Sequence, residues 1–290
     1  MKTLLLIDNH ALIYRFFHAL PPLTNPKGEA SGAIYGLSSV LLKIIKEQRP
    51  DYIAAAFDLP GKTFRTDLYD QYKIHRPTMP NDLQPQVKKA RELFNVFGIK
   101  TIDQEGFEAD DVIGSLAKKF KDEKDLVVII LSGDLDVLQL VVGEKVVIQF
   151  LKKGITETKL YDEEAVIERY GVTPKQLPDL KGLLGDTSDN IPGIKGVGPK
   201  TASPLIAKYG DLDGLFENLW ELPEKIGNKL ENQKESALFS KDLATIRVDI
   251  PLNFSLEDLK RESLSRDKIK DFFEEMGFNS LIKRLDNIID

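Results

Sequence analysis

Three short apolar runs that each end on an aspartate constrain this chain of 290 residues more than any other feature. The runs and their acids are Leu4–Ile7 with Asp8, Ile53–Phe57 with Asp58, and Val127–Leu131 with Asp134. Such runs are typical of buried parallel strands. Because ligands of open α/β sheets bind beyond the carboxyl ends of the strands, we predict that the three carboxylates meet at one edge. Carboxylates at close range repel unless a cation neutralises them, so this edge is a candidate divalent-metal site.

The composition is that of a globular protein, with 42% hydrophobic residues, and its length suits one large domain or two smaller ones. No apolar run approaches the roughly 20 residues that cross a bilayer, and the first run is too short for a signal peptide. The chain has no cysteine, which excludes disulfides and thiolate metal sites. We therefore expect a cytoplasmic protein with no membrane partner.

The net charge of −6 argues against a nucleic-acid partner, but the charges are unevenly distributed. Residues 1–100 contain 14 basic and 9 acidic residues, whereas residues 101–140 contain 4 basic and 10 acidic residues. Two bound divalent cations would offset much of the acidic zone and leave basic surfaces beside it. A nucleic-acid partner therefore remains possible.

The order of the predicted elements indicates two regions. Strands are expected at 3–8, 51–58, 99–102, 127–131 and 146–151. They alternate with a helical or loop segment at 10–20 and with helices at 34–48, 83–97 and 108–120. This order predicts an α/β fold with a mostly parallel twisted sheet flanked by helices. Helices dominate later, at 162–170, 174–184, 200–209, 212–219, 232–244 and 266–275. We place an α/β core at 1–160, with an insertion at about 62–100, and a helical region at 161–290.

Nine acids follow predicted strands or begin predicted helices and turns: Asp8, Asp58, Glu108, Asp110, Asp111, Asp134, Asp136, Asp186 and Asp189. Carboxylate oxygens suit Mg²⁺ or Mn²⁺, and nine acids exceed the needs of one ion. Two ions roughly 4 Å apart, as in nucleases and polymerases, activate a water and stabilise the leaving oxygen of a phosphoryl displacement. Taken singly, each acid has a simpler explanation as a strand-end cap, a helix-start acid or a turn residue.

A glycine-rich segment between two predicted helices matches a helix-hairpin-helix turn, which we place at about 178–209. Its glycines let the backbone approach a phosphate, and its lysines and the free amides of the next helix supply donors. The residues concerned are Gly193, Lys195, Gly196, Gly198 and Lys200. Such contacts recognise a duplex backbone without reading its sequence. The alternative is a loop with a purely structural role.

The stretch 59–82 is a long excursion from the strand ends in which basic and aromatic residues alternate. Lys62, Arg65, Tyr72, Lys73 and Arg76 could bind a single strand by phosphate pairing and base stacking. A solvated loop is the alternative. Arg15, in the helix after the first strand, could reach the metal edge or pair with a surface acid.

Together these motifs resemble the 5′ nuclease (flap endonuclease) family, and within it most closely the 5′–3′ exonuclease domains of bacterial DNA polymerases I. The matching segments, in order, are 4–8, 24–29, 57–65, 72–77, 105–111, 132–136 and 185–193. The resemblance covers residues 3 to at least 220. It implies a PIN-like sheet, an arch at about 62–100 and a structure-specific hydrolase that removes RNA primers or displaced 5′ flaps.

The resemblance also assigns residues. The first metal group matches Asp8, Asp58, Glu108, Asp110 and Asp134, and the second matches Asp111, Asp136, Asp186 and Asp189. Lys73 and Arg76 would steer the scissile phosphate and stabilise its developing charge. The family often holds a K⁺ on the hairpin carbonyls. The implied partners are branched or nicked duplex DNA with a 5′ end or flap, and a DNA polymerase in cis or in trans. The resemblance also implies a monomer that works in the bacterial cytoplasm, associated with the nucleoid.

The chain departs from the family pattern at a few positions. Asn9 replaces the usual glycine, Leu135 replaces a common lysine, and Ile74 and His75 stand where the arch commonly has alanine and asparagine. Pro204 falls early in the helix after the hairpin, where proline is tolerated near the first turn. These departures concern rate and DNA affinity more than the reaction.

Two other classes of function fit parts of the sequence. A non-catalytic DNA-binding module would keep the hairpin and bind duplex without Mg²⁺. A phosphatase with an aspartyl nucleophile usually has a second aspartate two residues after the first, where this chain has His10. The sequence leaves open whether the chain stands alone or forms the N-terminal part of a longer polymerase. It also leaves open the balance between exonuclease and endonuclease action, and the preference for DNA or RNA 5′ ends.

Overall fold

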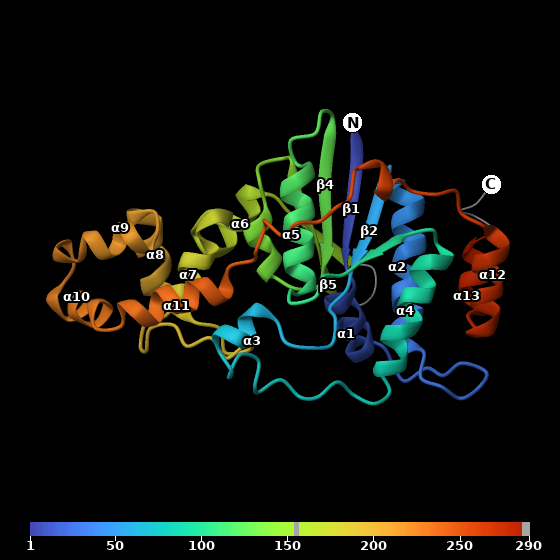
Figure 1. Cartoon of the computed structure of the whole chain (residues 1–290), viewed down its shortest axis with the longest axis horizontal. Helices are drawn as coiled ribbons and strands as arrows, with labels where there is room; N and C mark the ends of the chain where they lie inside the picture. Colours follow the sequence, from blue (N-terminus) through green and yellow to red (C-terminus); the bar gives the residue numbers. More distant parts are fainter. Residues whose placement is uncertain (154–156, 286–290) are drawn as a thin grey trace.

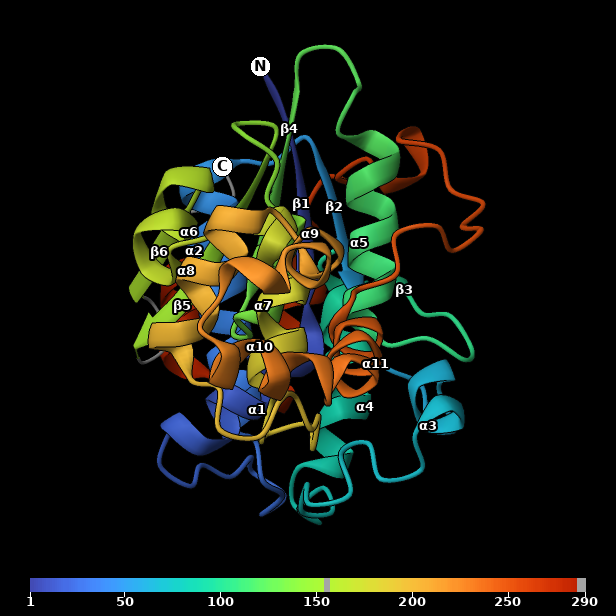
Figure 2. The ribbon, with the colours of Figure 1, turned by 90° about the vertical axis from the view of Figure 1, so that its left-hand side faces the viewer.

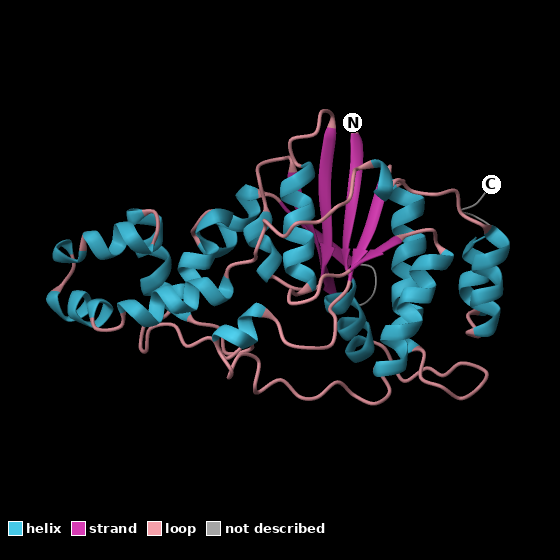
Figure 3. Cartoon of the chain, in the orientation of Figure 1, coloured by secondary structure: helices cyan, strands magenta, loops and turns pink. Residues whose placement is uncertain are grey.

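The predicted sheet forms the centre of the computed structural model, which describes residues 1–153 and 157–285 (Figures 1 and 3). Six strands lie in the order β3-β2-β1-β4-β5-β6, and all neighbours are parallel except β5 and β6. The strands are β1 (Lys2–Asp8), β2 (Tyr52–Ala56), β3 (Lys100–Ile102), β4 (Leu126–Ser132), β5 (Val146–Lys153) and β6 (Glu157–Tyr161). The mostly parallel α/β fold is therefore confirmed.

Helices cover both faces of the sheet. The helices of the core are α1 (Asn9–Ala19), α2 (Gly32–Gln48), α3 (Phe64–Leu68), α4 (Gln84–Val96), α5 (Ala109–Phe120) and α6 (Glu163–Tyr170), with a 3₁₀ turn, η1 (Asp136–Leu140), after β4. Alternate residues of β1 face opposite cores: Leu4 and Leu6 join the cluster of α5, whereas Leu5 and Ile7 join that of α1, α2 and α4. Burial on both faces explains the continuous apolar runs.

A helical lobe extends from one side of the sheet, with its tip at α9 and α10 (Figures 1 and 2). It contains η2 (Pro174–Gln176), α7 (Leu177–Leu184), α8 (Pro199–Tyr209), α9 (Leu212–Glu217), η3 (Leu219–Glu221), α10 (Glu224–Glu231) and α11 (Lys234–Ala244). Its buried residues, such as Leu183 and Leu212, belong to the same apolar cluster as Val128 of β4. The lobe is therefore packed continuously onto the sheet.

The end of the described chain returns to the core. Residues 246–250 pass α5, and Arg261 donates its backbone N–H to the carbonyl of Asp51 at 2.9 Å. Beyond η4 (Glu257–Leu259), α12 (Arg266–Glu275) and α13 (Asn279–Leu285) pack with α2 and α4, far from the lobe (Figure 1). The region predicted as one helical unit, 161–290, thus divides between the lobe and the core, and its last five residues lie outside the described residues.

The elements missed by the sequence pattern are those that bury little. β6 is an edge strand with a mostly polar sequence, so it carries no apolar run. α10 buries Gly227 and Leu230, and α13 buries Leu281 and Leu285, which is too few for a clear helical period. Pro204 lies inside α8, past the first turn, although the sequence placed it early. No helix among the described residues combines the length and apolarity that a bilayer crossing requires.

Candidate metal centre

The three strand-end aspartates meet at the carboxyl edge of the sheet, because β1 pairs directly with both β2 and β4. They line a cavity of about 1190 Å³ between the sheet edge, α4 and the segment that follows β2. The predicted acids that line this cavity are Asp8, Asp58, Glu108, Asp110, Asp134, Asp136 and Asp189, and Asp103 lines it as well. Seven of the nine acids predicted from the sequence therefore converge on one space.

Local structure holds two of the three strand-end carboxylates, those of Asp8 and Asp58, in place. Asp8 caps α1: its Oδ1 accepts the backbone N–H of Ala11 at 3.0 Å, and its Oδ2 accepts the Ser132 hydroxyl at 2.6 Å. Asp58 reaches the start of α5, where its Oδ1 accepts the N–H of Ala109 at 2.6 Å. These bonds leave lone pairs of both carboxylates directed at the cavity.

Burial and mutual repulsion oppose ionisation of these acids. The pKa of Asp8 is raised to about 7, mainly by burial and in part by the nearby charges of Asp134 and Asp58, while the Ser132 and Ala11 hydrogen bonds oppose the rise. Burial also raises the pKa of Asp110, with the charges of Asp8 and Asp134 adding to the effect. Burial raises the pKa of Asp136 to about 6. Buried carboxylates with raised pKa values are what a cation pocket shows when no cation neutralises it.

These shifts predict that the metal-free protein loses stability as the pH rises from about 4 to about 7. In the native state Asp8 and Asp136 have pKa values of about 7 and 6, so they keep their protons over this range. In the unfolded state the same carboxyls have the usual pKa of 3.8 and have already lost them, so each rise in pH favours the unfolded state. Divalent ions bind the ionised carboxylates, so their stabilising effect should grow over the same window.

Thermal denaturation between pH 5 and 8, in EDTA and in Mg²⁺, measures both trends. The depressed pKa of Asp186, about 2, contributes only below pH 4 and does not interfere. The lowered pKa of His10 acts in the opposite direction below pH 6.5, but it is one group against three acids with raised pKa values, Asp8, Asp110 and Asp136. A melting temperature in EDTA that rose steadily from pH 5 to 7 would contradict the prediction.

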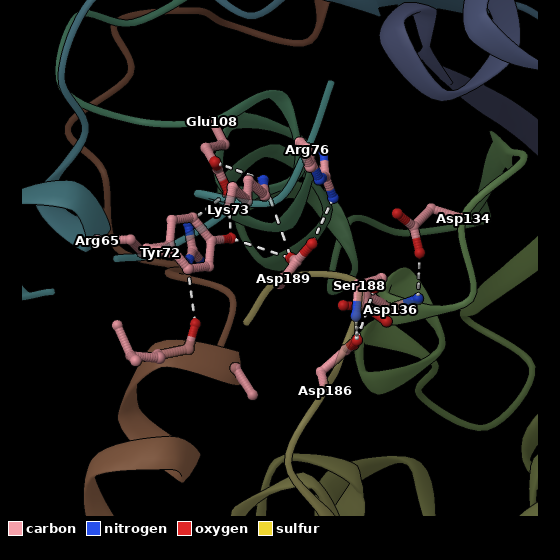
Figure 4. A network of polar contacts seen from close by, with 12 residues as sticks. Arg65, Tyr72, Lys73, Arg76, Glu108, Asp134, Asp136, Asp186, Ser188 and Asp189 are labelled. Carbon is pink, nitrogen blue, oxygen red and sulfur yellow. Dashed lines mark hydrogen bonds and ion pairs between the residues drawn. The ribbon is translucent and has the colours of Figure 1, made fainter. Parts of the chain in front are cut away.

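The second group of acids is held by basic side chains. Lys181 of α7 donates to Asp136 Oδ1 at 2.5 Å and to Asp186 Oδ2 at 2.8 Å. Burial alone would raise the pKa of Asp186, but Lys181 and Ser188 outweigh it and lower the pKa to about 2. Asp186 is bound to the Ser188 hydroxyl at 2.6 Å as well (Figure 4). This lysine was not singled out in the sequence, because a lysine five residues before an aspartate has no distinctive spacing.

The two cationic residues predicted to act in catalysis from the arch, Lys73 and Arg76, lie directly against the acids (Figure 4). Lys73 Nζ is 2.6 Å from Glu108 Oε1 and 4.0 Å from Asp189 Oδ2, and Arg76 donates to Asp189 Oδ1 at 2.5 Å. Lys73 has a positive φ of 56°, and its backbone N–H donates to the Asp189 carbonyl at 3.0 Å. The arch therefore places its two cations at the mouth of the acid cavity.

Tyr72 occupies a different place from the one predicted. Tyr72 is 6% exposed, and its hydroxyl lies within hydrogen-bond distance of both Glu108, at 3.1 Å, and Asp189, at 3.2 Å. A buried ring cannot offer an open face to a base, so the role predicted for it, stacking on a single strand, does not fit this geometry. The hydroxyl instead ties one acid of the core to one acid of the lobe.

Arg65 and Asp111 form a buried ion pair, which departs from both of their predicted roles. Arg65 is 3% exposed and meets Asp111, which is 0% exposed, through two bonds of 2.7 and 2.8 Å. Asp111 also accepts the backbone N–H groups of Arg247 and Glu108, so all four of its lone-pair positions are used. Arg65 therefore has no access to DNA, and Asp111 no free oxygen for a metal.

The same guanidinium joins the core to the lobe. Arg65 donates to the carbonyls of Leu243 and Thr245, at the end of α11, at 2.9 and 3.0 Å. The Arg65 guanidinium also donates to the Glu108 carboxylate at 3.1 Å. With the two bonds to Asp111, all five of its N–H donors are used. We assign Arg65, which lines the cavity, and Asp111, which does not, a structural role.

Two further cations lie outside the acid cavity. Arg15 does not line it: its guanidinium donates to the Lys152 carbonyl and lies 5.7 Å from the centre of the Phe150 ring. Lys62 is exposed. Arg15 is therefore directed at β5, whereas Lys62 is accessible to a ligand.

His10 was given no role in the sequence, but it lies in the cavity. Its Nδ1 accepts the backbone N–H of Asp58 at 3.1 Å, so the proton of the neutral ring is on Nε2. Burial lowers its pKa, and Arg91 and Lys73 add to the effect, while Asp58 opposes it. His10 is thus a neutral donor beside the acids.

The glycine hairpin is built from two turns in close contact. Gly193 has φ of +63°, and a Cβ there would lie 2.1 Å from the backbone nitrogen of Gly185. Ser240 of α11 accepts the Gly193 N–H at 2.9 Å. Only glycine fits position 193, so its role is close backbone packing, whereas Gly196 and Gly198 lie on the exposed surface.

The surface of the hairpin is basic. Lys195 and Lys200 are exposed and make no ion pair within residues 1–153 and 157–285, and Lys229 of α10 lies 3.3 Å from the Gly196 carbonyl. Gly198 caps α8, which starts at Pro199. The Gly198 carbonyl accepts the N–H groups of Thr201 and Ala202, so the exposed groups of the hairpin are its glycines and lysines, which follow the Asp186–Asp189 turn in the chain.

The residues fit hard divalent cations, although no preformed coordination sphere is present. In the described part of the chain, no three acidic or histidine side chains already have the spacing of a metal site. Lys73, Arg76 and Lys181 instead occupy carboxylate oxygens of the cavity. The donors are oxygens without thiolates, which is the set that Mg²⁺ and Mn²⁺ prefer.

Comparisons with known proteins agree with this arrangement. Residues 3–171 match the family model "5'-3' exonuclease, N-terminal resolvase-like domain", and residues 172–267 match "5'-3' exonuclease, C-terminal SAM fold". The boundary between the two models falls about ten residues after the one predicted from the sequence. The second model ends within α12, before α13.

Curated relatives include two kinds of protein. The chain is 43% identical over 284 residues to DNA polymerase I of Caldicellulosiruptor bescii, covering 97% of this chain and 33% of that protein. It is 39% identical over 288 residues to a 5'-3' exonuclease of Aquifex aeolicus, covering 99% of this chain and 96% of that one. The chain thus spans about a third of the polymerase relatives and almost the whole of the shorter one.

The fold also matches solved structures. A bacteriophage T5 flap endonuclease in a pseudo-enzyme–product complex with DNA and metal ions superposes with a TM-score of 0.68, at 22% identity, over 99% of this chain and 98% of that one. At this identity the match supports the fold. The two family models together cover residues 3–267, and the match to the Aquifex exonuclease covers nearly the whole of both chains. The chain therefore belongs to the 5′–3′ exonuclease family, as its motifs predicted.

Proposed function

We propose that this chain is a divalent-metal-dependent, structure-specific 5′ nuclease that hydrolyses phosphodiesters near a 5′ end or the base of a 5′ flap. One observation carries the proposal: acids from three strand ends line one cavity, with two arch cations at its mouth and a basic hairpin on the adjoining lobe. A phosphodiester backbone is the ligand that such a combination of charges recognises.

Two Mg²⁺ or Mn²⁺ ions are the cofactors we propose. Asp8, Asp58, Asp110 and Asp134 with Glu108 would hold the first, and Asp136, Asp186 and Asp189 would hold the second. When bound, such ions activate a water and stabilise the leaving oxygen. Asp111 is omitted from the set given by the resemblance, because Arg65 and backbone amides use all its acceptor positions.

Lys73 and Arg76 would act on the scissile phosphate. In this structure they neutralise Glu108 and Asp189, which are carboxylates of the proposed metal groups. Cations on those acids would free the ammonium and the guanidinium to donate to phosphate oxygens at the same place. Charge-assisted donors of this kind stabilise the charge that develops during phosphoryl transfer.

The hairpin would grip the duplex beside the cleavage point. Lys195 and Lys200 are exposed together with Gly196 and Gly198, which suits contact with successive phosphates. The family resemblance adds a K⁺ on the hairpin carbonyls. Such contacts read the backbone and not the sequence, which fits an enzyme that recognises structure.

The double variant Lys195→Ala, Lys200→Ala is expected to weaken duplex binding and to lower the salt slope of log K by about 2, since each phosphate contact contributes roughly 0.9. Binding of a labelled duplex, measured in Ca²⁺ between 50 and 200 mM salt, gives the slope. Lys208→Ala is the control, because this lysine lies at the far end of α8 and pairs with Glu221 at 2.7 Å. An unchanged slope in the double variant would remove the hairpin from the DNA interface.

The proposed substrate is branched or nicked duplex DNA, and the proposed setting is primer removal and repair in the bacterial cytoplasm, on the nucleoid. A DNA polymerase is the proposed partner, in cis or in trans, because the chain matches a third of DNA polymerase I in several relatives and nearly the whole of a shorter exonuclease. We further propose that the chain acts as a monomer.

A 5′-flap duplex labelled at its 5′ end tests the proposal. With Mg²⁺ we expect one main product, cut within a nucleotide or two of the flap junction, and none in EDTA. A matched blunt duplex is the control for structure specificity. Binding of the flap without any cleavage in Mg²⁺ or Mn²⁺ would instead identify a non-catalytic DNA-binding module.

A further inference from the structure

The two groups of acids differ in how their charge is neutralised. Asp8, Asp110 and Asp134 make no ion pair with any basic residue that the structure describes. Asp136 and Asp186, by contrast, are joined by the Lys181 ammonium at 2.5 and 2.8 Å. Three acids of the first group are therefore open to cations (the open acids), although Glu108 of that group pairs with Lys73 and Arg65, whereas Lys181 already joins two acids of the second group.

Lys181 belongs to the lobe but reaches back to the core. It lies on α7, and its partner Asp136 begins η1 directly after β4, whereas Asp186 follows the end of α7. Its side chain is 21% exposed, and those of its partners are 25% and 17% exposed. The three groups are thus largely shielded from water, where a charge interaction is strong.

We propose that Lys181 is an internal counter-cation, which neutralises Asp136 and Asp186 when divalent ions are absent and competes with one divalent ion for the same two carboxylates. The inference rests on the proposed function and specifies how the second ion binds. It predicts that the two ions bind with unequal affinity, the first at the open acids and the second, more weakly, at the acids that Lys181 occupies.

Geometry makes the two cations alternatives. Mg²⁺ needs its oxygens at about 2.0–2.1 Å, whereas the ammonium lies between the same oxygens at hydrogen-bond distance. The ion and the ammonium cannot occupy one position, so binding of the ion displaces the lysine. Lysine is suited to such movement, because its charge is carried on a flexible four-carbon stem.

A structural bridge between core and lobe is the simpler alternative. Removing such a bridge would lower stability without strengthening metal binding, whereas removing a competitor strengthens it. The measured affinity for a metal ion therefore separates the two roles, independently of cleavage.

The experiment is a titration of the full chain with Mn²⁺ alone, followed by the electron paramagnetic resonance signal of free Mn²⁺ at pH 8 and fixed ionic strength. Wild type is expected to bind two ions of unequal affinity. Lys181→Met keeps the length of the side chain and removes its charge, and we expect it to bind the weaker ion at least about tenfold more tightly, since two charge-assisted hydrogen bonds no longer compete. Lys181→Arg retains the charge and should leave this ion weakly bound.

Lys241→Met is the matched control. Lys241 also pairs with a buried carboxylate of α7, Asp179, at 2.6 Å, but Asp179 does not line the acid cavity. Its removal should leave both Mn²⁺ affinities unchanged. An equal gain in Lys241→Met, or an unchanged or reduced affinity in Lys181→Met, would overturn the inference while leaving the proposed function intact.

Folding is checked by circular dichroism in the same buffers. If Lys181→Met folds only with Mn²⁺, the Mn²⁺ midpoint of its folding replaces the titration, and a midpoint above the weaker wild-type affinity overturns the inference. Failure of wild type itself to take up Mn²⁺ would overturn this inference and the metal-dependent function together, whereas two equal wild-type affinities would overturn the inference alone.

Discussion

Asp8→Asn is expected to lower the rate of flap cleavage by about 10³-fold or more while the protein stays folded. Ionised Asp8 is proposed to hold a cation that contributes several kcal/mol of transition-state stabilisation, which corresponds to a factor of this size. The asparagine oxygen can still accept the Ala11 N–H that caps α1. Single-turnover cleavage of the flap substrate in Mg²⁺ measures the effect.

The simpler explanation of Asp8, as a helix cap, is tested by a second cap. Asp162 caps α6 in the same way, accepting the Ala165 N–H at 2.9 Å, and it lies away from the cavity. Asp162→Asn should leave cleavage almost unchanged. Asp8→Asn should also melt no lower than wild type in EDTA at pH 8, because the substitution removes a carboxyl whose pKa burial raises to about 7. Equal rates for the two variants would make Asp8 a cap and nothing more.

The largest effect on stability is expected at Arg65. Arg65→Met leaves Asp111 fully buried without its partner, which should cost about 3–5 kcal/mol of unfolding free energy. The guanidinium donates four more hydrogen bonds, which Arg65→Met also removes. Their acceptors are the second oxygen of Asp111, the Glu108 carboxylate and the carbonyls of Leu243 and Thr245. Urea denaturation of the two proteins gives the difference directly.

A double variant separates the ion pair from general packing. Arg65→Met with Asp111→Asn removes both charges and keeps an oxygen that can accept a backbone N–H of Arg247 or Glu108, so it should lose less stability than Arg65→Met alone. Lys62→Ala, in the same excursion but exposed, should change stability by no more than about 0.5 kcal/mol. A loss below about 1 kcal/mol in Arg65→Met would contradict the structural role assigned to this residue.

The fold could be read from the sequence where burial leaves a pattern. β1, β2 and β4 are covered on both faces, so their apolar runs are continuous and end where the aspartates begin. β6 lies at the sheet edge and α10 at the tip of the lobe, and both bury little, so neither leaves a comparable pattern. The return of α12 and α13 to the core depends on contacts with α2 and α4, which no local pattern encodes.

The site was predictable as a set of acids but not as a set of partners. The family motifs located the acids, the arch cations and the hairpin by position. They could not show that Arg65 turns inward to Asp111, because its neighbour Lys62 has the same kind of sequence context and faces solvent. The bridges made by Lys181 and Tyr72 join core to lobe over long separations in the chain, so only the folded arrangement shows them.

The central claim is that the carboxyl edge of the sheet and the adjoining lobe together hold two divalent cations. Anomalous diffraction from crystals of the full chain soaked in Mn²⁺ tests it most directly. We expect two peaks roughly 4 Å apart, one beside Asp8 and Asp134 and one beside Asp136 and Asp186. Peaks confined to surface carboxylates, or no peak within the cavity at millimolar Mn²⁺, would contradict the claim.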